Sequence, residues 1–184
     1  MDITISQKGY TLLEILIIVI IIGTLASWAL SSWSTVIGNS RQITLINDYH
    51  TLFSFGRWQA ASISGIVTIC PLANDGKCTD DWTLPVHVFA DNDRDGQPDD
   101  DILRTMSGPA YPSIVRSRTA GSGYLRFADN GMIHGRTGGI VLCTPGASTE
   151  LVYLAINKGG RFRAEYDRDG DGEIVTASGD SITC

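Results

Sequence analysis

Glu14 is the only charged residue in the mainly apolar stretch of residues 10–30. A carboxylate inside hydrocarbon costs roughly 2.5–3.5 kcal/mol, so such an acid needs a cationic partner. Cleavage after Gly9 would supply one, because the new α-amino group of Tyr10 is positive and lies four residues before Glu14. In a bundle of staggered parallel helices, Glu14 of one subunit would neutralise the Tyr10 amine of its neighbour. We therefore predict that this pair sets the register of assembly.

The apolar stretch itself is long enough to cross a membrane, since residues 10–30 would measure about 32 Å as a helix. Three interpretations are open: a secretory signal, a plain single-pass anchor, or an anchor that is also an assembly surface. Ser27 and Ala29 are small residues at the spacing that signal peptidase prefers, which favours a signal removed after Ala29. Glu14 argues against that signal and favours the third interpretation.

Residues 8–14, KGYTLLE, resemble the processing site of type IV pilins and of the pseudopilins of type II secretion. The resemblance implies that prepilin peptidase removes a leader of residues 1–9 by cutting after Gly9. It also implies that the enzyme N-methylates Tyr10, so that Glu14 becomes the fifth residue of the mature chain. The expected location is the bacterial inner membrane, with one pass over residues 10–30, the head in the periplasm, and the pilus tip after assembly.

The helical pattern continues over residues 31–62, which we expect to form the amphipathic, soluble half of one long helix. Apolar or small residues recur every three or four positions, which predicts one face packed against a sheet. Gly38, Asn39 and Ser40 are expected to loosen the junction between the two halves. A helix from residue 10 to about 62 would be about 80 Å long. The residues of the predicted stripe are Ile43, Ile46, Tyr49, Phe53, Gly56 and Ala60.

From residue 63 onward, short runs rich in β-branched and aromatic residues alternate with Gly, Pro, Asn and Asp, which indicates strands and turns. The gaps are too short for crossover helices, so the connections should be antiparallel. The sequence thus predicts an α+β fold in which one long N-terminal helix packs on antiparallel β-sheets. The predicted strands are residues 66–70, 84–90, 102–106, 114–117, 124–127, 140–143, 151–156 and 161–166.

The β-rich head, residues 63–184, resembles the GspH/FimT group of minor pilins and pseudopilins, which implies the type IV pilin fold. Its tail, residues 167–184, extends past the point where many relatives end. The matching stretches are, in order, FGRWQAA at 55–61, VTIC at 67–70, an aspartate-rich hairpin within 88–104, LRFADNG at 125–131, LC at 142–143 and GGRFR at 159–163.

Composition excludes several classes of protein. The chain has 184 residues, of which 43% are apolar and 18% charged, so it is not a disordered chain. One long apolar stretch is too few for a polytopic membrane protein. His50, His87 and His134 lie far apart, and no neighbouring Ser, Cys or carboxylate motif completes a triad or a metal centre. We therefore expect no enzymatic activity.

The four cysteines form no CxxC pair, and their even number favours two disulfides in an oxidising compartment. We expect Cys70 and Cys78 to close a short loop. Cys143 with Cys184 would then fix the C-terminal tail to a strand. The other two pairings remain open.

Two aspartate clusters follow the alternation of the first half of a calcium-binding EF-hand loop. The twelfth position should be a bidentate Glu, but it is Ile102 in one cluster and Ser178 in the other. Acidic hairpin turns also occur without a metal. We therefore expect no cofactor, with calcium as the alternative and the second cluster as its better site. The clusters are Asp91, Asp93, Asp95, Gly96 and Asp99, and Asp167, Asp169, Asp171 and Gly172.

Charge is unevenly distributed along the head. Residues 102–164 contain eight basic and two acidic residues, whereas residues 91–101 and 165–173 are strongly acidic. A local basic surface can bind phosphates even in a chain whose net charge is −6. Residues 160–163, GRFR, match the GRxR motif associated with DNA binding in FimT-like minor pilins. The resemblance implies Arg161 and Arg163 as DNA-binding candidates, unless they pair with the aspartates downstream. The neighbouring basic residue Lys158 is a third candidate.

These features predict a minor pilin of a type IV pilus that joins the tip or priming complex. One alternative is a DNA-binding minor pilin that acts in natural transformation, with double-stranded DNA as its partner. The other is the H-type pseudopilin of a type II secretion system. The expected partners are the major pilin and other minor pilins, prepilin peptidase and the inner membrane.

Overall fold

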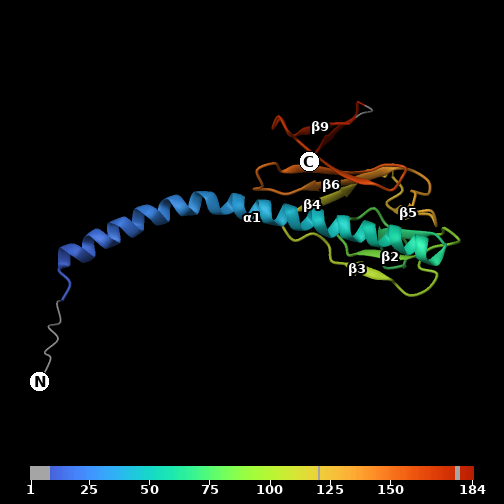
Figure 1. Ribbon diagram of the computed structural model, residues 1–184, viewed down its shortest axis with the longest axis horizontal. Helices are drawn as coiled ribbons and strands as arrows, with labels where there is room; N and C mark the ends of the chain where they lie inside the picture. The colour runs from blue at the N-terminus through green and yellow to red at the C-terminus, as the bar shows by residue number, and fades with distance from the viewer. Residues whose placement is uncertain (1–8, 120, 177–178) are drawn as a thin grey trace, which may run out of the picture.

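A single helix, α1 (Leu12–Ile63), runs through the computed structural model and extends far beyond the head (Figure 1). The structure describes residues 9–119, 121–176 and 179–184, without the side chains of residues 28–32. Thr11 caps the helix, because its Oγ1 accepts a hydrogen bond from the Glu14 backbone N–H at 3.2 Å. The helix ends where Ser64 adopts a left-handed conformation with φ 51°. The predicted leader lies outside the described residues, apart from Gly9.

The described side chains in the first part of α1, up to Ser27, lie outside the buried core of the head. The apolar residues of this part are exposed, with Leu12 at 84% and Leu25 at 63%. Within the described residues, which omit the side chains of 28–32, no helix has both the length and the apolar character needed to cross a membrane. The span expected over residues 10–30 stays a prediction.

Two four-stranded antiparallel sheets pack along the second part of α1 (Figure 1). The fold confirms the predicted arrangement of one long helix on antiparallel sheets, and each predicted strand lies within two residues of an observed one. The first sheet has the order β3 (Arg104–Met106), β2 (Val86–Ala90), β1 (Val67–Pro71), β5 (Leu125–Phe127). The second has the order β4 (Ile114–Ser117), β6 (Gly138–Cys143), β7 (Leu151–Ile156), β8 (Phe162–Tyr166).

The core of the head lies between α1 and the two sheets. Tyr49 and Phe53 are fully buried and share one cluster with residues of both sheets, among them Val88 and Leu154. Gly56 allows α1 to approach β1, since a Cβ at that position would lie 2.6 Å from Ile69 Cδ1. The helix is therefore held by large buried apolar side chains, and a glycine leaves room where the Ile69 side chain reaches the helix.

The predicted apolar stripe is wrong at its first member. Ile43 is 58% exposed, whereas the neighbouring Gln42 is buried and donates a hydrogen bond from Nε2 to the Thr149 carbonyl. At this position α1 faces the backbone of a loop, so an amide that can bond the Thr149 carbonyl is buried in place of an aliphatic side chain.

The junction is docked, contrary to the expectation that Gly38, Asn39 and Ser40 loosen it. All three are helical, and a Cβ on Gly38 would lie 2.4 Å from the carbonyl carbon of Gly146. Asn39 Nδ2 donates to Ser148 Oγ at 3.0 Å, and the Ser148 backbone N–H donates to Asn39 Oδ1 at 2.8 Å. The glycine thus serves close packing of α1 on the β6–β7 turn.

A third sheet, β9 (Glu173–Val175) with β10 (Ser181–Thr183), was not predicted and covers the outer face of the second sheet. Ile174 and Ile182 are buried there against a small cluster that includes Tyr153. The structure contains both favoured disulfides, Cys70–Cys78 and Cys143–Cys184. The second one fastens this hairpin to β6.

Substituting Gly38 by Ala should destabilise the head by about 1–3 kcal/mol, because the added methyl group meets backbone atoms that cannot yield. Thermal unfolding of the full chain in detergent, followed by circular dichroism, measures the effect. Gly23→Ala is the matched control, since nothing lies within 4 Å of a Cβ there. Equal melting temperatures for the two variants would contradict the docked junction.

Candidate functional site

The first candidate site is the segment that opens α1. Gly9 and Tyr10 precede the helix as exposed, non-helical residues, and Tyr10 is 77% exposed. Glu14 lies in the first turn, where the helix dipole favours an anion. Among the described residues no cation forms an ion pair with Glu14. A partner for this carboxylate, and a cover for the apolar side chains around it, must come from outside the folded chain.

The first aspartate cluster is built around a buried ion pair that the sequence did not predict. Arg126 Nη2 lies 2.9 Å from Asp91 Oδ2, and both side chains are at least nine-tenths buried. Thr68 Oγ1 donates to the same carboxylate at 2.6 Å, and Arg126 Nη2 donates to the Arg94 carbonyl at 2.8 Å. Arg126 therefore anchors the acidic loop and does not belong to the basic surface.

The ion pair between Arg126 and Asp91 disfavours calcium binding at the first aspartate cluster. Oxygens of Asp91, Asp93 and Asp99 lie within 4.8 Å of one another, but Arg126 already neutralises Asp91. A cation bound there would compete with a buried guanidinium.

The second cluster has no such internal cation among the described residues. Oxygens of Asp167, Asp169 and Asp171 also lie within 4.8 Å of one another. Desolvation alone would raise the pKa of Asp167, but hydrogen bonds from the backbone N–H groups of Gly172 and Gly170 lower it. The Asp167 carboxylate is thus held ionised in an exposed loop, and calcium binding at either cluster stays a prediction.

The three DNA-binding candidates lie close in sequence but differ in their surroundings. Arg163 is 75% exposed and forms an ion pair with Glu165. An acidic partner was expected, but it is this glutamate and not one of the aspartates farther downstream. Lys158 Nζ donates to the Gly135 carbonyl at 2.8 Å. Of these three candidates, Arg161 is the one whose side chain makes no hydrogen bond or ion pair with a described residue.

Arg161 lies on the rim of a groove of about 510 Å³ between α1 and two turns of the head. Phe162, the residue between the two arginines, stacks on Phe53 with ring centroids 4.5 Å apart. The sequence did not identify the other lining residues because they come from three separate segments. The lining residues are His50, Ser54, Arg57, Trp58, Ala61, Asn130, Gly131, Gly160, Arg161 and Phe162.

Two family models match the chain. The model described as type II transport protein GspH matches residues 45–160, and the prokaryotic N-terminal methylation motif matches residues 5–30. Two crystal structures of the type IV minor pilin FimU from Pseudomonas aeruginosa strain PAO1 are similar, with 19% and 18% identity and a TM-score of 0.49 for each. Each match covers 62% of this chain, and 85% and 81% of the FimU chains respectively. No curated protein matches the chain.

Replacing Arg126 by Met should destabilise the head by about 3–5 kcal/mol, because it leaves the Asp91 carboxylate buried without a cation. Urea unfolding of the full chain in detergent gives the free energy. Arg163→Met is the matched control, since the exposed pair with Glu165 should contribute no more than about 1 kcal/mol. A loss of stability no larger in Arg126→Met than in this control would refute the structural role of the buried pair.

The DNA-binding hypothesis predicts a gel shift of double-stranded DNA by the full chain in detergent at low salt. Arg161→Ala should weaken the shift more than Arg163→Ala, because Arg163 is already paired with Glu165. Absence of a shift at low salt would remove the hypothesis, and equal losses would show that Glu165 does not hold Arg163.

Proposed function

Because the chain belongs to the GspH family of type IV pilin-like proteins, we propose that it is a minor pilin built into the tip or priming complex of a type IV pilus. Its function is then assembly, and its long helix is the part that other pilins contact. Other minor pilins and the major pilin are its partners, and the head carries the surface that faces outward.

One observation carries this proposal: Glu14 is the only charged residue between Tyr10 and Ser40, on a helix whose apolar side chains are exposed. An exposed apolar surface of this extent must be covered by lipid or by other chains. The carboxylate then needs a cation at the same depth. The α-amino group of a neighbour's Tyr10 meets this need when subunits are staggered along the helix axis.

Processing supplies that amino group. The methylation motif covers residues 5–30, which include the proposed cleavage site after Gly9. Prepilin peptidase would cut there and N-methylate Tyr10, a change that leaves the amine cationic. Before assembly, residues 10–30 would hold the chain in the inner membrane with the head in the periplasm. In the fibre, the same residues would pack among other pilin helices.

The H-type pseudopilin of a secretion system would use the same processing and the same Glu14. Two disulfides in the head support the pilus, because a fibre tip outside the cell gains from loops that are covalently closed. Neighbouring genes distinguish the two roles: pilus genes beside this one agree with the proposal, and a set of secretion genes contradicts it.

Glu14→Leu should abolish incorporation into fibres and leave the chain anchored, because it removes the charge pair and keeps the apolar surface. Immunoblots of sheared fibres and of membranes measure both effects. Asp48→Asn, which removes an exposed acid elsewhere on α1, is the matched control and should be incorporated normally.

Mass spectrometry of the native chain provides the second readout, with a mature start at N-methylated Tyr10. An intact N-terminus, or normal incorporation of Glu14→Leu, would contradict the proposal.

A further inference from the structure

The groove beside Arg161 is formed where two turns of the head meet α1. Gly131 and Gly160 each have φ 70°, and a Cβ on Gly160 would lie 2.4 Å from the Gly131 carbonyl oxygen. A Cβ on Gly131 would lie 3.0 Å from Arg57 Nε. Only glycines let these turns approach each other and the arginine so closely. We call this site the Arg57 groove, with the lining given above.

Arg57 lies in the groove with most of its hydrogen-bonding capacity unused. Its guanidinium has five N–H donors, and in the described structure it makes one hydrogen bond, from Nη1 to the Gly160 carbonyl at 3.4 Å. It forms no ion pair with a described acid, and no acidic residue lines the groove. With Arg161 on the rim, two guanidinium groups are available to a carboxylate or sulfate, which arginine binds in bidentate fashion.

The other walls are an aromatic surface and a set of small polar groups. Trp58 is 62% exposed, although it is a large apolar side chain on the head. Ser54, Asn130 and His50 add a hydroxyl, an amide and an imidazole to the lining. A pyranose ring offers a C–H face that packs on an indole, and hydroxyls around its edge that bond to such groups. A ring that also bears an acid would match the two arginines.

We propose that the Arg57 groove binds an acidic saccharide, a sugar ring that carries a carboxylate or a sulfate group. The ring packs on Trp58, the acidic group binds Arg57 and Arg161, and the polar side chains bind hydroxyls. Single-stranded nucleic acid fits less well, because it needs several stacking surfaces along a basic track. Phe162 is already stacked on Phe53, which leaves Trp58 as the one large exposed aromatic side chain of this lining.

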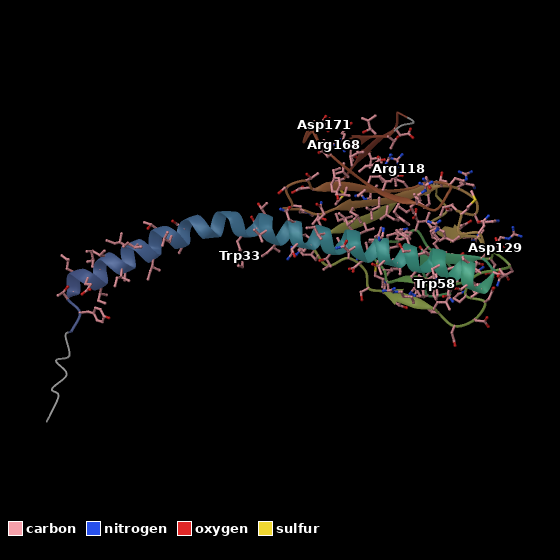
Figure 2. All side chains as sticks on the ribbon, viewed as in Figure 1. Trp33, Trp58, Arg118, Asp129, Arg168 and Asp171 are labelled. Atoms are coloured by element: carbon pink, nitrogen blue, oxygen red, sulfur yellow. A yellow bond between two sulfur atoms is a disulfide. The ribbon has the colours of Figure 1, made fainter. Side chains whose placement is uncertain are left out.

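The position of the groove suits an external ligand. Figure 2 shows Trp58 on the part of α1 farthest from the N-terminus, whereas Trp33 lies on the part outside the head. If the chain is a fibre subunit as proposed above, the first part of α1 is covered by other helices and the groove stays accessible. The accessibility in the fibre therefore rests on the proposed function, but the binding itself does not.

Calorimetry on the full chain in detergent tests the proposal with three hexasaccharides: an oligogalacturonate, a sulfated maltohexaose and neutral maltohexaose. We expect an acidic sugar to bind and the neutral one to bind at least about tenfold more weakly. The two acidic sugars distinguish a carboxylate from a sulfate as the preferred group. Trp58→Ala and Arg57→Gln should each weaken binding about tenfold.

Matched variants separate binding from folding. Trp33→Ala removes another exposed tryptophan of α1, and Arg163→Gln removes an arginine outside the groove; both should bind normally. Arg161→Gln keeps the contact between Arg57 and Gly160 intact, so weaker binding in this variant cannot be attributed to a disturbed fold.

Several results would overturn the proposal. These are equal affinity for maltohexaose, undiminished binding by Trp58→Ala, or no binding of either acidic sugar. Tighter binding of a single-stranded oligonucleotide would assign the groove to nucleic acid. Tighter binding of a peptide that copies residues 165–173 would assign it to a contact between subunits. Glu14→Leu should bind sugar normally, so failure of fibre assembly and failure of this proposal are distinguishable.

Discussion

One uninterrupted helix packs in the core of the head with its second part and exposes an apolar surface with its first part. The rest of the structure depends on this constraint. The second part of α1 buries Tyr49 and Phe53 in the head, while the first part exposes apolar side chains around a single carboxylate. A helix of 52 residues is about 78 Å long, so side chains at its two ends cannot meet. The position of Glu14 relative to the head is therefore determined by the direction of α1. That direction is fixed where Gly38 and Asn39 contact the β6–β7 turn.

A few contacts between segments that are distant in sequence hold the surface loops of the head in position. Arg126 joins β5 to the loop that begins at Asp91, and left-handed glycines at 131 and 160 bring two turns onto α1. Because these contacts are buried or backbone-mediated, they hold the surface loops without using the exposed charges. The half-buried Arg57 and the exposed Arg161 form no ion pair in the described structure, so both guanidinium groups remain available to a ligand.

Much of the fold follows from local pattern. Runs of β-branched and aromatic residues, separated by turn residues, located the eight strands of the two large sheets. The hairpin β9–β10 was missed because each strand has three residues and buries one isoleucine, Ile174 or Ile182, which is too little for a periodic signal. Gly38 was misread because flexibility and close packing select the same residue. Which of the two applies is decided by Gly146, more than 100 residues away.

The candidate sites likewise differ in how far local sequence predicts them. Glu14 was found because a single carboxylate in an apolar run can be recognised from the sequence alone. Arg126 was counted with the basic surface, because a basic residue between Leu125 and Phe127 in a strand is expected to face solvent. Its burial depends on Asp91, which is distant in sequence. The Arg57 groove could not be found from sequence, since it exists only where α1 and two turns converge.

The contact between Gly38 and the β6–β7 turn also has a mechanical meaning. In the fibre proposed above, tension would be transmitted along the helices, and α1 is the only described element that leaves the head (Figure 1). A pull on α1 parallel to its axis would load this contact and the Tyr49–Phe53 layer in shear, so many interactions would have to break together. The two hydrogen bonds between Asn39 and Ser148 lie at the edge where that load enters the head.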